Sequence, residues 1–256
     1  MREEDRLAYM ERIKCQVPTQ MNGEILDRLI RSHLEQIPFE NLDVIDFGRV
    51  PELGEDILFE KIVRKKRGGY CFELNILFRR LLESLGLFVY PVAARVLWNR
   101  DYLPPVSHMG LVADIAGRKG FCDVGYGGPG PKGLLWLEEG EQSVSGERFR
   151  VERAVNGDFF IQRLHGKEWK RVLCFRDAPV EETDFQVLNF YCARNEKIIF
   201  TQKRIVNLCT PSGSKALTDM ELTVREAEKV YQTVYRDKGE LEQGLRQEFG
   251  ICVAFD

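Results

Sequence analysis

The chain has 256 residues, of which 44% are hydrophobic and 30% are charged, as in globular proteins that bury a substantial core. Its 37 lysines and arginines against 40 aspartates and glutamates give a formal net charge of −3. Such a balance lacks the basic surface by which proteins attract nucleic acid or anionic membranes, so neither is expected as a partner.

Signals for export, membrane insertion and metal binding are not found in the sequence. The N-terminal residues are too polar for a signal peptide, and no apolar stretch reaches the roughly 18 residues of a membrane span. The 7 cysteines are widely spaced without a CxxC pair, and no HExxH occurs. We therefore predict a cytoplasmic chain with reduced thiols and no metal.

The first part of the chain is predicted to be helical, because apolar residues recur there at intervals of three and four. The predicted helices cover residues 3–16, 23–37, 54–66 and 71–85. Pro38 stops the second helix, and Gly86 ends the fourth. His33 falls on the apolar stripe of the second helix, which favours a packed core histidine over a catalytic one.

The pattern then changes to short runs of β-branched and aromatic residues separated by turns. Strands are predicted at 88–98, 106–115, 120–124, 150–154, 158–164 and 169–175. They indicate an antiparallel sheet or small barrel over about residues 87–185. His165 precedes a glycine in a predicted hairpin turn, where a solvated role is expected. The segment 125–133 is the strongest loop signal in the chain.

Helical patterns return in the last part of the chain. Helices are predicted at 183–193, 223–236 and 238–248, and strands at 203–208 and 251–255. Helices followed by strands and then by a mixed segment predict an α+β protein with closely packed subdomains.

Cys71 is the candidate nucleophile. It follows two glycines and begins the predicted helix 71–85, where unpaired backbone N–H groups and the helix dipole favour an anion. Such a position lowers the pKa of a thiol, and the thiolate is the reactive form. The competing interpretation, an inert buried cysteine, is preferred for each of the other six.

His108 and Asp123 are the candidate partners of this cysteine. Each lies in a predicted strand, where aspartate is uncommon and a buried carboxylate needs a partner. If the two strands are neighbours, Asp123 accepts a hydrogen bond from one imidazole nitrogen and leaves the other for a nucleophile. Cys122 is a rival nucleophile, but its side chain points to the opposite face from Asp123.

Four segments in this order are similar to one known family. IPFENLDV (37–44), RGGYCFELN (67–75), SHMGLV (107–112) and FCDVGYGGPGP (121–131) resemble segments of the arylamine N-acetyltransferases. The chain is too short for the insert of vertebrate members, so a prokaryote-like member is expected. The resemblance implies a helical bundle (1–86), an antiparallel β-barrel (87–190) and a C-terminal α/β lid (191–256), with a cysteine-protease-like core.

The resemblance also implies a reaction. Cys71 would take an acetyl group from acetyl-CoA as a thioester, with His108 as its base and Asp123 orienting the imidazole. An arylamine, a hydrazine or an arylhydroxylamine oxygen would then take the acetyl group, completing a ping-pong cycle without a metal.

Further positions carry over from the same resemblance. Phe39 and Tyr126 would line the substrate pocket, although Phe39 also fits a core aromatic. Gly125, Gly127 and Gly128 would let the pyrophosphate of CoA approach backbone N–H groups, although the segment also fits a simple turn. Arg67 and Glu40 are expected to form an ion pair behind the cysteine. At position 70 the family often has Phe, whereas this chain has Tyr70. The hydroxyl of Tyr70 is expected to reach only water or backbone.

Other functions stay open at this point. A relative that closes macrolactams, or another Cys–His–Asp acyl transferase such as a transglutaminase or a protease, would use the same three residues. A module that binds CoA or aromatic amines without turnover is the non-enzyme alternative. The sequence gives neither the preferred amine nor the oligomeric state.

Overall fold

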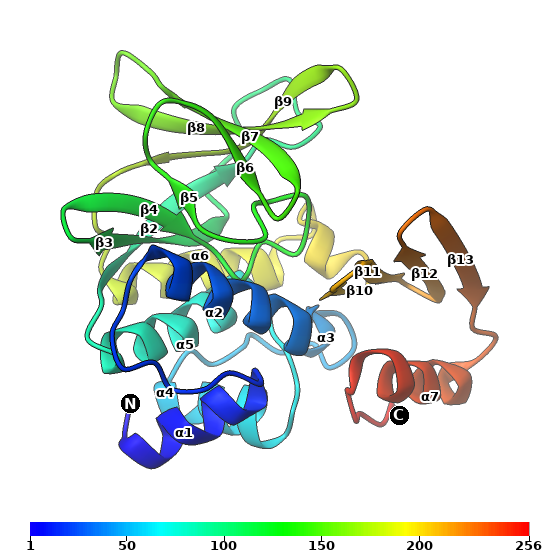
Figure 1. The fold of residues 1–256 in the computed structure, drawn as a ribbon. Helices are drawn as coiled ribbons and strands as arrows, with labels where there is room; N and C mark the ends of the chain where they lie inside the picture. The colour runs from blue at the N-terminus through cyan, green and yellow to red at the C-terminus, as the bar shows by residue number, and fades with distance from the viewer. Residues whose placement is uncertain (256) are drawn as a thin grey trace.

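The first third of the chain is helical in the computed structural model, which describes residues 1–255 (Figure 1). The α-helices are α1 (Glu3–Arg12), α2 (Gly23–Gln36), α3 (Leu42–Ile45), α4 (Glu55–Phe59) and α5 (Cys71–Ser84). A π-helical turn, Glu60–Arg64, follows α4 directly. Asn22 caps α2 by accepting a hydrogen bond from the backbone N–H of Ile25. The four predicted helices are confirmed, while the short α3 was not predicted.

His33 lies in the core between three helices. Its side chain is 0% exposed, its Nδ1 is 3.0 Å from the Tyr9 hydroxyl of α1, and its ring packs edge-on against Phe78 of α5. Burial, with a smaller contribution from the positive charge of Arg12, lowers the pKa of His33 to about 3. The prediction that His33 is a packed core histidine is confirmed, and its side chain is completely buried.

The buried His33 is expected to make the protein sensitive to acid. The folded state keeps the ring neutral down to about pH 3, whereas the unfolded chain binds a proton below about pH 6.5. Its contribution to stability is therefore complete above pH 6.5 and falls by about 1.4 kcal/mol per pH unit below that value. Urea unfolding at pH 7.5 and 5.5 tests this.

The matched variants for this test are His33→Gln and His165→Gln. His33→Gln removes the titrating ring, so its free energy of unfolding should fall by about 1.4 kcal/mol less than that of the wild type between these pH values. His165 is exposed, so His165→Gln should behave like the wild type. Equal pH dependence for the wild type and His33→Gln would contradict the prediction.

An eight-stranded antiparallel sheet forms the middle of the chain and curls into a nearly closed barrel (Figure 1). Its strands are β2 (Phe88–Val96), β3 (His108–Ile115), β4 (Arg118–Cys122), β5 (Leu135–Trp136), β6 (Gly140–Val144), β7 (Glu147–Arg153), β8 (Asp158–His165) and β9 (Glu168–Arg176). The order is β5-β4-β3-β2-β9-β8-β7-β6. The side chain of Gln142 on β6 exchanges two hydrogen bonds with the backbone of Trp136 on β5, which links the two edges.

The interior of this barrel is filled by aromatic and aliphatic side chains that alternate along its strands. Phe121, Phe149 and Ile161 are each 0% exposed there. The predicted antiparallel sheet or barrel is thereby confirmed. The short edge strands β5 and β6 were not predicted.

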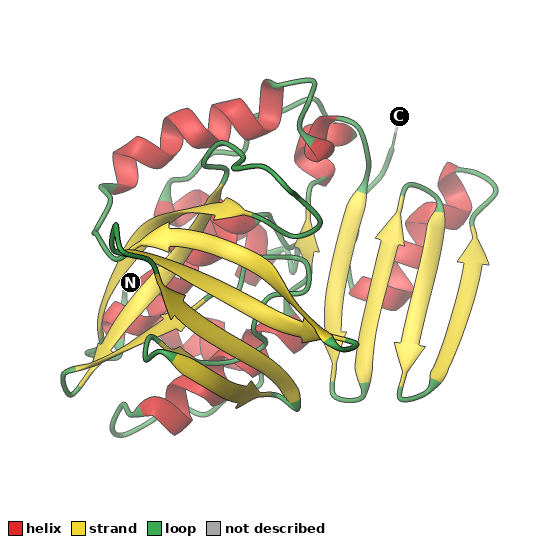
Figure 2. Ribbon diagram, turned by 90° about the horizontal axis from the view of Figure 1, so that it is seen from above, coloured by secondary structure: helices red, strands yellow, loops and turns green. Residues whose placement is uncertain are grey.

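A second antiparallel sheet lies beside the barrel, with one helix packed on it (Figure 2). Its strands are β1 (Phe39–Glu40), β10 (Ile205–Thr210), β11 (Gly213–Thr218), β12 (Glu221–Glu226) and β13 (Lys229–Val234), in that order across the sheet. The remaining helices are α6 (Phe185–Arg194), α7 (Lys238–Phe249) and 3₁₀ turns at Glu182–Asp184 and Ile199–Thr201. The predicted strand 203–208 and the predicted helices 183–193 and 238–248 are confirmed.

The helix predicted at 223–236 is wrong. These residues form most of the hairpin β12–β13, which turns at Ala227 with a positive φ of 50°. The β-branched and aromatic residues on both sides of the turn, such as Val224 paired with Tyr231, favour strands once they pair. The strand predicted at 251–255 is also wrong, because this segment has no regular structure.

Of the two predicted domain boundaries, one falls in a loop and the other falls inside a helix. Residues 86 and 87 lie in the loop between α5 and β2, whereas residues 190 and 191 lie inside α6. The division into three domains stays a prediction. Across residues 1–255, no helix is both long enough and apolar enough to cross a bilayer.

Candidate active site

Cys71 is the first residue of α5, as predicted, and its side chain is buried. The preceding residue, Tyr70, donates its backbone N–H to Oε2 of Glu73 at 3.0 Å, so a carboxylate caps the first turn of the helix. The Tyr70 hydroxyl donates a hydrogen bond to Oδ1 of the buried Asn189 on α6. The expectation that this hydroxyl reaches only water or backbone is therefore wrong.

His108 begins β3, and Asp123 directly follows the neighbouring strand β4. Antiparallel pairing of β3 with β4 places the start of β3 beside the end of β4. Nε2 of His108 is 2.6 Å from Oδ2 of Asp123, and both side chains are buried. Asp123 comes directly after the last residue of β4, instead of inside the strand as predicted. The free end of the strand lets its carboxylate turn towards the imidazole.

The imidazole also interacts with the Cys71 side chain, whose sulfur is 4.0 Å from the carbonyl oxygen of Ser107, the residue before His108. Because Asp123 occupies Nε2, the nitrogen that faces the sulfur is Nδ1. Burial lowers the pKa of His108, but the Asp123 charge and the hydrogen bonds to Asp123 and Cys71 outweigh it and raise this pKa to about 10. The structure thus brings Cys71, His108 and Asp123 together in the order thiol, imidazole, carboxylate.

The electrostatics of the thiol differ from the sequence-based expectation. Burial raises the pKa of Cys71, and the contact with His108 lowers it only in part. The prediction from the helix N-terminus had the opposite sign, because desolvation of a buried sulfur outweighs the helix dipole. Among the groups around the thiol, His108 is the one that lowers its pKa most.

Gly125 fixes the distance between the loop after β4 and the nucleophile. A Cβ at this position would lie 2.6 Å from Cα of Cys71, so only glycine allows this approach. Its backbone N–H donates to Oδ1 of Asp123 at 2.8 Å. Gly125 therefore differs from its predicted role, because its N–H is not available to a pyrophosphate.

An ion-pair network lies behind Cys71. Arg67 pairs with Glu40 at 2.7 Å and with Asp43 at 3.0 Å. Lys61 pairs with Asp43 and with Glu73, each at 2.6 Å. The predicted pair of Arg67 and Glu40 is confirmed, and the network joins the segment before α5 to α3 and to the π-helical turn.

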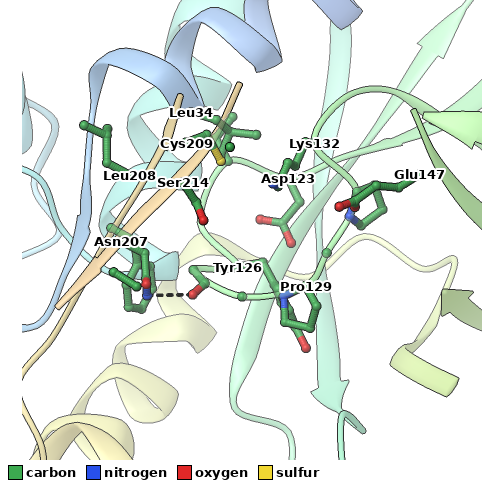
Figure 3. Close-up of a pocket in the computed structure, with 18 of the residues that line it drawn as sticks. Leu34, Asp123, Tyr126, Pro129, Lys132, Glu147, Asn207, Leu208, Cys209 and Ser214 are labelled. Atoms are coloured by element: carbon green, nitrogen blue, oxygen red, sulfur yellow. Dashed lines mark hydrogen bonds between the residues drawn. The ribbon is translucent and has the colours of Figure 1, made fainter. Parts of the chain in front are cut away.

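A cleft of about 540 Å³ lies next to the triad, between the barrel and the second sheet (Figure 3). Asp123 and Tyr126 line the cleft, and the Tyr126 ring stands edge-on to the His108 imidazole with centroids 5.5 Å apart. Phe39 also lines the cleft while packing against Phe200, and its role in binding substrate stays a prediction. Cys71 is only 2% exposed, and of the three residues Cys71, His108 and Asp123 the cleft is lined by Asp123.

The loop after Tyr126 forms one side of the cleft. Gly127 and Gly128 line it, and Gly127 has a positive φ of 65° with its Cα against the Phe39 ring. Asn207 of β10 donates a hydrogen bond to the Gly127 carbonyl at 2.8 Å, so the second sheet holds this loop (Figure 3).

Polar and charged residues also line the cleft. Lys132 and His165 come from the barrel side, whereas Arg225 and Ser214 come from the second sheet. Among the described residues, no carboxylate pairs with Lys132 or Arg225 within 4 Å. His165 lies in a hairpin as predicted and is exposed. Sequence reasoning missed Lys132 and Arg225 as lining residues, because their distance along the chain hides their proximity.

Asn75 is a further residue that sequence reasoning missed. It is fully buried and its side chain bonds to Asp123 at 2.9 Å. The available signal was an asparagine on the apolar face of a helix, four residues after the nucleophile. No cluster of three or more acidic, histidine or cysteine side chains with the geometry of a metal site occurs within residues 1–255.

Comparison with known proteins identifies relatives along the whole chain. The model of an N-acetyltransferase family matches residues 24–256. An arylamine N-acetyltransferase of Mycobacterium tuberculosis is 32% identical over 256 residues, which cover 98% of this chain and 90% of that protein. An arylamine N-acetyltransferase / N-hydroxyarylamine O-acetyltransferase of Salmonella typhimurium is 34% identical over 254 residues, with 96% and 88% covered.

Solved structures agree with this result. The Salmonella typhimurium arylamine N-acetyltransferase superposes with a TM-score of 0.93 at 30% identity, covering 98% of this chain and 92% of that one. The Mycobacterium marinum arylamine N-acetyltransferase in complex with CoA gives 0.87 at 26% identity, covering 96% and 92%. The fold and the site thus define an acyltransferase. The chain belongs to the arylamine N-acetyltransferase family.

Proposed function

We propose that this enzyme transfers the acetyl group of acetyl-CoA to the nitrogen of arylamines and arylhydrazines, or to the oxygen of arylhydroxylamines, through an acetyl-Cys71 intermediate. The observation that carries the proposal is the contact of the Cys71 thiol with an imidazole whose other nitrogen is 2.6 Å from Asp123. A base that is oriented by a carboxylate and touches a thiol is the arrangement of nucleophilic acyl transfer.

In the first half-reaction the Cys71 proton already resides on Nδ1 of His108, and the thiolate attacks the thioester carbonyl carbon. A carbon–sulfur bond to Cys71 forms as the bond to CoA breaks, and the imidazolium returns the proton to the departing CoA sulfur. In the second half-reaction the amine attacks the acetyl-cysteine, its proton passes to His108, and the Cys71 sulfur leaves. Asp123 stabilises the imidazolium in both halves.

The cleft supports this choice of substrates. Phe39 and Tyr126 offer aromatic faces beside the triad for a flat aryl group. Lys132 and Arg225 in the cleft supply positive charge for the phosphates of CoA, and Gly127 and Gly128 allow a close approach of the donor. A CoA complex of the related Mycobacterium marinum enzyme is consistent with a CoA donor.

Intact-mass spectrometry after exposure to acetyl-CoA tests the proposal. We expect the protein to gain one acetyl group on Cys71, to release one equivalent of CoA, and to lose the acetyl group when an arylamine is added. Cys192→Ser should behave like the wild type, because Cys192 is another buried thiol, whose sulfur is 3.6 Å from the Ser107 carbonyl oxygen, and it is not the proposed nucleophile.

Other outcomes would support the alternatives. Binding of CoA without acetylation would point to a binding module. Acylation by long-chain acyl thioesters but not by acetyl-CoA would point to an amide synthase, and cleavage of a peptide substrate to a protease.

A further inference from the structure

Asn75 lies on the helix that carries Cys71 and bonds to the segments that carry His108 and Asp123. It lies on α5 four residues after Cys71, so the two side chains share one face of the helix. Its Nδ2 donates to the backbone carbonyl of Met109 at 2.7 Å, next to His108 on β3. The same Nδ2 donates to Oδ1 of Asp123 at 2.9 Å.

The acceptor side of this amide is also used. Oδ1 of Asn75 accepts the backbone N–H of Val124 at 3.0 Å, directly after Asp123. Both N–H groups and the carbonyl oxygen of the amide thus have partners, and these partners fix the orientation of the amide. The side chain is 0% exposed, so no water replaces a bond that is lost.

The hydrogen bonds at Asp123 divide between its two oxygens. Oδ1 accepts from Asn75 and from the Gly125 N–H, whereas Oδ2 faces Nε2 of His108. Two donors on one oxygen fix the rotation of the carboxylate. Because the carboxylate cannot rotate, Oδ2 points at Nε2 of His108 and sets the orientation of the imidazole.

We propose that Asn75 is a positioning residue that holds the Asp123 carboxylate against His108 and keeps β3 and the end of β4 in place on the nucleophile helix. This inference rests on the proposed roles of Cys71, His108 and Asp123. Asn75 acts through Asp123, so its effect on the reactivity of Cys71 should depend on whether that carboxylate is present.

The test measures the alkylation rate of Cys71 by iodoacetamide in the folded protein, in a double-mutant cycle. Asn75→Ala should lower this rate at pH 7 by about tenfold, as expected for the loss of a hydrogen bond to a charged group. In the Asp123→Asn background the same substitution should change the rate by less than about twofold, because the carboxylate that it positions is gone. The pH profile of alkylation should shift in the same direction in both single variants.

Asn41 provides a matched control. It is equally buried and makes three hydrogen bonds to backbone groups, to Phe200, Lys203 and Ile205, away from the triad. Asn41→Ala should reduce thermal stability while leaving the alkylation profile unchanged.

A second variant covers the case in which Asn75→Ala does not fold. Asn75→Asp keeps the size of the side chain and the acceptor for Val124 but removes both donors, and it should show the same dependence on Asp123. Equal effects of either substitution with and without the Asp123 carboxylate would overturn the proposal, as would failure of both variants to fold. Alkylation needs no acetyl donor, so this result is independent of whether acetyl-CoA is the substrate.

Discussion

Replacing Cys71 by alanine is expected to reduce acetyl transfer by roughly 10⁶-fold, the loss measured when a nucleophile is removed from a comparable triad. The reason is that the acetyl group then has no sulfur to which it can transfer, and the amine must attack the donor directly. The cysteine is a small side chain at the start of α5, so the fold should persist. The measurement is CoA release in the presence of an arylamine, together with circular dichroism.

The control for this prediction is Cys192→Ala. The Cys192 sulfur is 3.6 Å from the Ser107 carbonyl oxygen, and the Cys71 sulfur is 4.0 Å from the same oxygen. Cys192 is therefore the thiol best placed to substitute for Cys71, and its removal should leave turnover close to that of the wild type. Appreciable turnover in Cys71→Ala would contradict the proposed intermediate.

Replacing Asp123 by asparagine is expected to lower kcat by about 10⁴-fold, the effect of the same change in a serine protease triad. The amide keeps the shape of the carboxylate but does not stabilise an imidazolium. The pKa of His108, which Asp123 helps to raise to about 10, should fall. Rates of acetyl transfer and of Cys71 alkylation between pH 5 and 10 measure both effects.

The same variant should change how stability depends on pH. The raised pKa of His108 stabilises the folded state fully below about pH 6.5, and this contribution is lost as the pH rises through about 10. Asp123→Asn should therefore lose less stability than the wild type between pH 7 and 10. Asp177→Asn is the control, because Asp177 pairs with Lys119 on the barrel surface. An unchanged kcat in Asp123→Asn would contradict the assigned role.

The triad was predictable from the sequence because each member carries a local signal. Cys71 lies two residues after a pair of glycines at the start of an apolar helix, His108 is a polar residue in an apolar strand, and Asp123 is a polar residue at the end of another. The ion pair of Arg67 and Glu40 came from the resemblance to a family. The helical first third and the antiparallel middle were predictable because hydrophobic periodicity is local.

The missed features depend on contacts between distant segments. The hairpin β12–β13 looked helical because residues near Ala227 favour a helix, and only pairing across the turn favours strands. The sign of the Cys71 pKa shift was missed because burial does not appear in a local pattern. Lys132 and Arg225 line one cleft although about 90 residues separate them, as is common for binding sites between subdomains.

The pairing of β1 with β10 has a consequence for how the protein is divided. Phe39 forms a bridge to Gly69, two residues before the nucleophile, and also pairs with Asn207 of the second sheet. The C-terminal strands β10–β13 thus extend a sheet whose first strand, β1, lies beside the residues that precede Cys71. They are therefore an integral part of the fold. Cutting the chain after the barrel would leave the Phe39–Glu40 strand with an open edge, so an amino-terminal fragment is a poor choice for producing a working catalyst.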